Sequence, residues 1–174
     1  MIKLYKRHSD GTIEYHEAWI DGRKIIEHRG KLGTRGDTRI HKIKSRVNQS
    51  ELERVLHGAR QEGFAEIDLD KHRRLLVEYP VQGMGATEDL DKRCRLEEVL
   101  NNALGWTGLG MCDGGSIGSG TMEVCCFVVD FPTARSVVEA SLAGTEFANF
   151  SRIYDEDADD PPQSLIDREQ PGQP

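Results

Sequence analysis

The stretch VCCFVVDFPTARSVVEASLAG, residues 124–144, predicts a buried strand followed directly by a helix. Residues 124–129 are apolar at every position, which is typical of a central strand covered on both faces. Asp130 and Pro132 favour the first turn of a helix. Apolar residues then recur at helical spacing until Gly144 ends the helix: Ala134, Val137, Val138 and Leu142.

The segments on either side of this stretch complete a pattern over residues 71–154. The expected elements are a strand at residues 75–77 closed by Pro80, a helix capped by Thr87 and ended by Gly105, a strand over 106–112, a turning segment over 113–120, and a last strand over 147–154. The resulting order, strand, helix, strand, strand, helix, strand, is typical of a ferredoxin-like α+β sandwich.

Residues 1–70 predict a separate unit made of an antiparallel sheet and one helix. Asp10-Gly11 and Asp21-Gly22 are turn signals between alternating strands, and residues 38–44 have the β-branched content of another strand. Asn48 and Glu51 then have the spacing of a helix capping box. The apolar stripe of this helix, which ends at Gly63, consists of Leu52, Val55, Leu56 and Ala59.

The charge is divided unevenly between the two halves of the chain. Residues 1–80 hold 17 Lys and Arg against 13 Asp and Glu, a net charge of +4, whereas residues 81–174 hold 6 against 17, a net charge of −11. This asymmetry predicts two units with different partners. Residues 155–174 are acidic and rich in proline, which is typical of a solvated tail.

The composition bears on three properties: membrane insertion, secretion and disulfide formation. No stretch approaches the ~20 apolar residues that cross a bilayer, and the first residues lack the pattern of a secretory signal. The four cysteines are Cys94, Cys112, Cys125 and Cys126. Two of them are adjacent, which makes a poor disulfide framework, so we expect a cytoplasmic protein without disulfides. The missing apolar stretch predicts that the protein has no membrane partner.

Basic residues gather between Arg29 and Arg46, among glycines at 30, 33 and 36. Such a segment either solvates an exposed sheet edge or attracts phosphates. Aromatic side chains for base stacking are missing from it. The candidate nucleic-acid-binding residues are Arg29, Lys31, Arg35 and Arg39.

Residues 1–70 resemble the WGR domain. The resemblance is carried by EAWIDG at 17–22, RGKLGTRG at 29–36, and a helix that ends in EGF at 62–64. In the nuclear poly(ADP-ribose) polymerases this domain binds DNA ends, so the resemblance implies the fold and a nucleic-acid-binding module. Arg29-Gly30-Lys31 stands where the family has Trp-Gly-Arg, and Arg29 lacks that aromatic platform.

The second half resembles, more distantly, small bacterial immunity-type proteins, which neutralise a toxin by binding it. The similar segments are LGWTG at 104–108 and DGGSIGSG at 113–120. This resemblance implies a protein-binding surface, and its candidate residues are Trp106, Asp113, Ile117 and Glu123. Trp106 is either such an exposed anchor or a core residue.

Signals for catalysis, metal or cofactor binding are weak. The segment 114–120 continues toward a strand and lacks the lysine and helix of a phosphate-binding loop, so a hairpin connection explains it better. The cysteines lack zinc-ligand spacing and suit core packing. A histidine of the first half could meet a carboxylate of the second, but no spacing selects such a pair. We therefore expect a non-enzymatic protein-binding protein, possessing no catalytic, metal or cofactor site, and as the alternative a WGR-type nucleic-acid-binding module.

Overall fold

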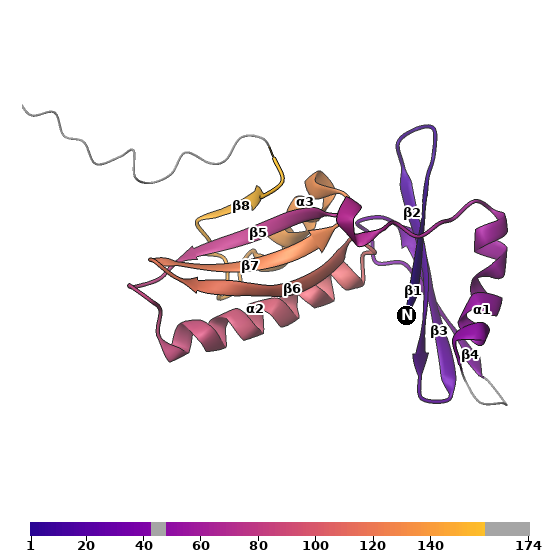
Figure 1. Cartoon of the computed structure of the whole chain (residues 1–174), viewed down its shortest axis with the longest axis horizontal. Coiled ribbons are helices and arrows are strands. Elements are labelled where there is room, and N and C mark those ends of the chain that lie inside the picture. Colours follow the sequence, from indigo (N-terminus) through magenta and orange to yellow (C-terminus); the bar gives the residue numbers. More distant parts are fainter. Residues whose placement is uncertain (43–47, 159–174) are drawn as a thin grey trace, which may run out of the picture.

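The computed structural model describes residues 1–42 and 48–158, which form an α+β structure with two antiparallel sheets and three α-helices (Figure 1). The first sheet has the strand order β1-β2-β3-β4, and the second has the order β6-β7-β5-β8. Lys44 and Arg46 of the basic segment, and the part of the expected tail from residue 159 onward, lie outside the described residues.

The first sheet and its helix occupy the N-terminal part of the chain. They consist of β1 (Ile2–Arg7), β2 (Ile13–Asp21), β3 (Lys24–Lys31), β4 (Asp37–Lys42) and α1 (Gln49–Gln61). Both predicted hairpin turns are present, with positive φ at Gly11 and Gly22. The Asn48 side chain accepts the backbone N–H of Glu51, as predicted for the helix cap. One face of α1 packs on one face of the sheet through Leu4, Ala18, Ile25, Leu52, Leu56 and Ala59.

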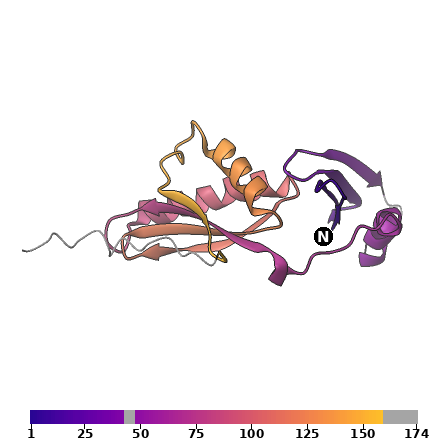
Figure 2. The same cartoon turned by 90° about the horizontal axis from the view of Figure 1, so that it is seen from above.

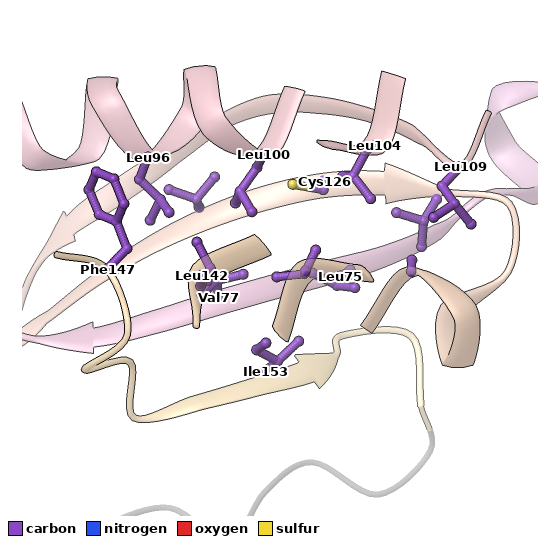
Figure 3. Close-up of a cluster of buried hydrophobic side chains, with 14 of the residues drawn as sticks. Leu75, Val77, Leu96, Leu100, Leu104, Leu109, Cys126, Leu142, Phe147 and Ile153 are labelled. Atoms are coloured by element: carbon purple, nitrogen blue, oxygen red, sulfur yellow. The ribbon is translucent and has the colours of Figure 1, made fainter. Parts of the chain in front are cut away.

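The second sheet carries two helices on one face (Figure 2). A 3₁₀ turn at Leu69–Lys71 leads into β5 (Arg73–Pro80), α2 (Thr87–Gly105), β6 (Gly110–Gly118), β7 (Thr121–Val128), α3 (Phe131–Leu142) and β8 (Arg152–Asp155). The Asp130 side chain caps α3, as predicted, by accepting the N–H of Thr133. The core between helices and sheet includes Leu75, Val77, Leu96, Leu100, Cys126 and Leu142 (Figure 3).

The glycine-rich segment is a strand, and its prediction as a turning segment was wrong. β6 runs to Gly118, and only Ser119 and Gly120 turn the chain, with φ of 53° and 88°. A β-bulge lies between Cys112 and Gly115. A Cβ atom at Gly115 would stand 2.0 Å from the Glu123 carbonyl oxygen, so glycine here permits the close pairing with β7.

Other predicted boundaries also need correction. Trp106 follows α2 as its C-cap and belongs to a turn, so the strand expected from residue 106 begins at Gly110. Ala86, not Thr87, is the N-cap of α2, and its N–H bonds to the Asp89 carboxylate instead. The expected strand at 147–154 is the shorter β8.

Parts of the basic segment and of the expected tail belong to strands. Arg29-Gly30-Lys31 forms the end of β3, because these residues continue the pairing with β2. Asp155, expected in the tail, is the last residue of β8, and its carboxylate forms an ion pair with the Arg73 guanidinium. Asp157 contacts Arg74.

The two sheets share one core. Tyr5, Ile13, Tyr15 and Leu32 of the first part join the cluster that contains α2, α3 and the second sheet. Hydrogen bonds also connect the parts: Tyr5 Oη donates to the Gly108 carbonyl at 3.0 Å, the Gly33 N–H donates to the Thr107 carbonyl at 2.9 Å, and Tyr15 Oη lies 3.5 Å from the Trp106 carbonyl oxygen. The turn after α2 therefore covers the face of the first sheet that α1 leaves free (Figure 1).

Candidate protein-binding groove

Trp106 lies at the junction between the two parts and contacts the first sheet. Its ring packs edge-to-face against Trp19, with centroids 6.1 Å apart, and against His28, with centroids 5.1 Å apart. The Arg35 guanidinium lies 5.5 Å from the centroid of the same ring. Trp106 is half-buried, so it is a contact between the parts that still presents some surface to solvent.

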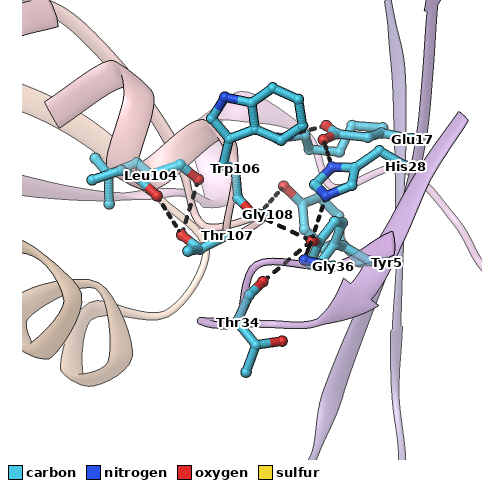
Figure 4. A network of polar contacts seen from close by, with 12 residues as sticks. Tyr5, Glu17, His28, Thr34, Gly36, Leu104, Trp106, Thr107 and Gly108 are labelled. Atoms are coloured by element: carbon cyan, nitrogen blue, oxygen red, sulfur yellow. Dashed lines mark hydrogen bonds and ion pairs between the residues drawn. The ribbon is translucent and has the colours of Figure 1, made fainter. Parts of the chain in front are cut away.

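A buried polar network lies next to Trp106 (Figure 4). His28 Nδ1 is 2.8 Å from a Glu17 carboxylate oxygen, and His28 Nε2 is 3.0 Å from the Tyr15 hydroxyl. The second Glu17 oxygen pairs with Lys3 Nζ at 2.8 Å. The Tyr15 hydroxyl accepts the Gly36 N–H at 2.9 Å. Because an ionised carboxylate only accepts hydrogen bonds, His28 Nδ1 is the donor to Glu17. When the imidazole is neutral, its Nε2 can then accept a hydrogen bond from the Tyr15 hydroxyl.

This network has the order carboxylate, imidazole, hydroxyl, but its burial favours a structural role. His28 is 0% exposed and Tyr15 is 1% exposed, so a substrate cannot reach the hydroxyl. Burial raises the pKa of Tyr15 to about 12, and the hydroxyl therefore stays protonated at neutral pH. The network satisfies buried polar groups and positions the sheet face that Trp106 contacts.

An apolar groove opens beside this contact, and we call it the junction groove. It has two adjoining hollows with volumes of about 610 and 230 Å³, which share Met1, Lys3, Gly110 and Met111. The larger hollow reaches Trp19 and Trp106, and the smaller one reaches Leu69 and Phe127. The groove therefore runs along the boundary between the first sheet and the start of β6.

Exposed apolar side chains are concentrated in the junction groove. The described residues contain seven large hydrophobic side chains that are exposed, and four of them line this groove: Met1, Ile20, Leu69 and Met111. A contiguous apolar surface of this kind typically marks an interaction site. Methionine is flexible and polarisable, so Met111 suits a surface that adapts to a partner.

The predicted partner-binding residues do not form one patch. Trp106 lines the groove, and Asp113 is exposed two positions after Met111 on the same strand. Ile117 lies at the other end of β6, opposite Met122 and close to Gly85. Glu123 lies on β7 and accepts hydrogen bonds from Tyr154 at 2.6 Å and Ser116 at 3.3 Å.

Sequence reasoning missed Trp19, Ile20 and Met111 as groove residues. Trp19, which stands at even spacing from Ile13 and Tyr15 as a core residue would, is half-buried at the junction. Met111 lay in a predicted strand without any signal for its exposure. Only the position of the adjacent apolar residues Trp19 and Ile20 next to the Asp21-Gly22 turn could have indicated a surface.

The basic candidates are spread over two faces of the first sheet. Arg29 and Lys31 line a polar hollow of about 510 Å³ between the sheet and α1, whereas Arg35 contacts Trp106 on the other face. Arg39 lies on β4, where it is the register partner of Glu27 on β3. Carboxylates share the polar hollow with these cations: Glu14, Glu27, Asp37 and Glu62. The hollow therefore has mixed charge.

Comparison with known proteins adds no assignment to this geometry. No known protein family, curated protein or solved structure matches this chain. In the described part of the chain, no three His, Cys, Asp or Glu side chains are placed to hold a metal ion. The same residues include no helix with the length and apolar character needed to cross a bilayer.

Proposed function

We propose that this chain is a non-enzymatic protein-binding protein that docks its partner in the junction groove. The observation that carries this proposal is the concentration of exposed apolar side chains there, next to half-buried Trp19 and Trp106. Aromatic and methionine side chains supply much of the energy at protein interfaces. The residues that line the groove lie between two packed units, so its walls are rigid. Rigid walls lower the entropic cost of binding.

The proposed partner is a basic protein with apolar side chains at its contact surface. The net charge of −11 in residues 81–174 favours encounter with such a partner, and Asp113 places a carboxylate beside the groove. A cytoplasmic bacterial toxin with a basic active site fits this description. We propose that the chain neutralises such a toxin by covering its active site, as immunity proteins do.

The same proposal includes the finer fold assignments. A WGR-like domain at residues 1–70 is supported by a four-stranded antiparallel sheet followed by one helix. A ferredoxin-like domain at residues 71–154 is supported by the strand order β6-β7-β5-β8 with both helices on one face.

Site-specific crosslinking in the host cell tests the groove. A photo-crosslinking amino acid in place of Met111 should capture a basic protein, whereas the same probe in place of Met84 should not. Met84 is a matched control because it is exposed to 75% and lies outside the groove, on the segment before α2. Equal capture at both positions, or capture at neither, would contradict the proposal.

Binding measurements with the purified captured protein complete the test. Met111→Asp should weaken binding by at least about tenfold, since it puts a charge into an apolar contact, and Met84→Asp should leave binding unchanged. Co-expression of the chain should protect cells from the captured protein. If co-expression fails to protect the cells, the proposal that the partner is a toxin is wrong. The proposal that the partner docks in the junction groove is then tested by the binding measurements alone.

Nucleic-acid binding through the first sheet is the second candidate. Within the part of the chain that the structure describes, the exposed side chains of Arg29, Lys31 and Arg39 form no ion pair. Mobility shifts of the full chain with duplex DNA and with RNA test this candidate. The affinity should fall steeply with salt, and charge reversal at Arg29 and Arg39 should abolish the shift.

A further inference from the structure

Cys112 and Cys126 face each other across β6 and β7. They are direct partners in the register of the two strands, and their Sγ atoms lie 2.8 Å apart. Cys126 is 0% exposed, in the core under α2, whereas Cys112 is half-buried at the edge of that core. The sequence treats these residues only as core material, because fourteen positions separate them.

The backbone geometry brings this pair within reach of a covalent bond. The Cys112 N–H points away from β7, since it donates to the Asn101 side-chain oxygen at 2.8 Å. Cys112 and Cys126 therefore form the non-hydrogen-bonded type of antiparallel pair, whose Cα atoms are about 4.5 Å apart. That separation falls within the range of about 4.4–6.8 Å found for disulfides.

We propose that Cys112 and Cys126 are an oxidative modification site, at which a small-molecule disulfide such as oxidised glutathione converts the two thiols into an intramolecular disulfide. This inference is independent of the proposed docking function. Cys94 is exposed on α2, and the side chain of Cys125 points to the opposite face of the sheet from Cys126. Neither is paired with another cysteine in the described residues.

The exposure of the two thiols sets the order of the reaction. The Cys112 thiolate attacks one sulfur of oxidised glutathione, which forms a mixed disulfide and releases one molecule of glutathione. The Cys126 thiolate then attacks Cys112 Sγ, breaks the bond to glutathione and releases the second molecule. Each thiol loses its proton, the two cysteines are oxidised, and the glutathione disulfide is reduced to two thiols.

The second step should be slow at neutral pH. In the reduced protein the hydrogen bond with Cys112 and burial both raise the pKa of the Cys126 thiol, and burial still disfavours its thiolate after Cys112 has reacted. Ring closure should therefore accelerate as the pH rises. The bond, once formed, ties β6 to β7 beside the bulge.

Intact-mass measurement in glutathione redox buffers tests the proposal. The variant Cys94→Ser, Cys125→Ser keeps only the facing pair, and it should lose the mass of two hydrogen atoms while remaining monomeric. Peptide mapping of the oxidised protein without substitutions should find the same Cys112–Cys126 disulfide. The matched control adds Cys112→Ser, and its single buried thiol should stay unmodified.

The outcomes are distinct. A stable glutathione adduct on Cys112, linkage between molecules, or two thiols that remain free under oxidising buffer would each overturn the proposal. The oxidised double variant should also melt higher than its reduced form, by on the order of 5 °C, because the crosslink restricts the unfolded chain. Equal melting temperatures would show that the bond does not form in the native geometry.

Discussion

At the scale of single residues, Gly108 determines how closely the two parts approach. Its φ is +71°, and a Cβ atom there would lie 2.3 Å from the Tyr15 ring. The same residue supplies the carbonyl that Tyr5 binds. A glycine is therefore required for both backbone conformation and packing.

Gly108→Ala should destabilise the protein by about 3 kcal/mol, because strain from the left-handed conformation adds to a clash in the core. Gly11→Ala is the matched control, since Gly11 also has a positive φ but open space around it. It should cost only about 1 kcal/mol. Urea unfolding of both variants gives the comparison, and equal losses would show that the Tyr15 contact is unimportant.

Glu27 makes stability depend on pH in the acidic range. Burial alone would raise its pKa, yet hydrogen bonds with His41 and His16 outweigh burial and lower the pKa below its ordinary value. A carboxyl with a lowered folded-state pKa stabilises the fold above its unfolded pKa of about 4.3. This contribution is lost as the pH falls through the lower folded-state value.

Glu27→Gln should therefore lower the stability at neutral pH and flatten its decline between about pH 5 and pH 3. Thermal melts across this range measure the slope. Glu53→Gln, which changes an exposed ion pair with Arg60, should keep the slope of the original protein. An unchanged slope in Glu27→Gln would reject the role assigned to the His16 and His41 contacts.

At the scale of elements, the hairpin between β6 and β7 turns on two residues with positive φ, Ser119 and Gly120. Serine adopts this conformation reluctantly, whereas asparagine tolerates it and Asn-Gly is the preferred pair for such a turn. Ser119→Asn should therefore stabilise the protein by about 0.5 kcal/mol. Gly120→Asn, the complementary substitution, should destabilise it, and denaturant titration should order the variants accordingly.

The sequence predicts those elements whose signals are local. The caps at Asn48 and Asp130 and the turns at Gly11 and Gly22 depend on near neighbours, and all of them are confirmed. The second part of β6, residues 113–118, could not be recognised as a strand because its glycines carry no side chains and show no alternation. Its pairing is set by β7, and side chains of α2 cover its outer edge, where Arg93 binds the Gly115 carbonyl and Asn101 binds the Cys112 N–H.

At the scale of the whole molecule, the candidate groove could not be predicted because it exists only after two distant segments meet. Trp106 was identified as a possible anchor, but its neighbours Trp19 and His28 lie far away in the sequence. The shared core suggests that the parts also unfold together. Far-ultraviolet circular dichroism and calorimetry should show a single transition.

Trp106→Ala should weaken this coupling. It removes the ring contacts with Trp19, His28 and Arg35, and we expect a loss of about 2 kcal/mol and a broader or divided transition. Leu90→Ala, on the exposed side of α2, is a control that should leave the transition single. Two well-separated transitions in the original protein would contradict a shared core.

The chain has two tryptophans, and both stand at the boundary between its parts. Their indoles are close enough for their excited states to interact, so the ultraviolet emission of the unlabelled protein originates almost entirely from that one place. Spectroscopy without any dye therefore observes the junction between the halves directly. A ligand that settles there should change the colour and polarisation of this light while the helices keep their own signal.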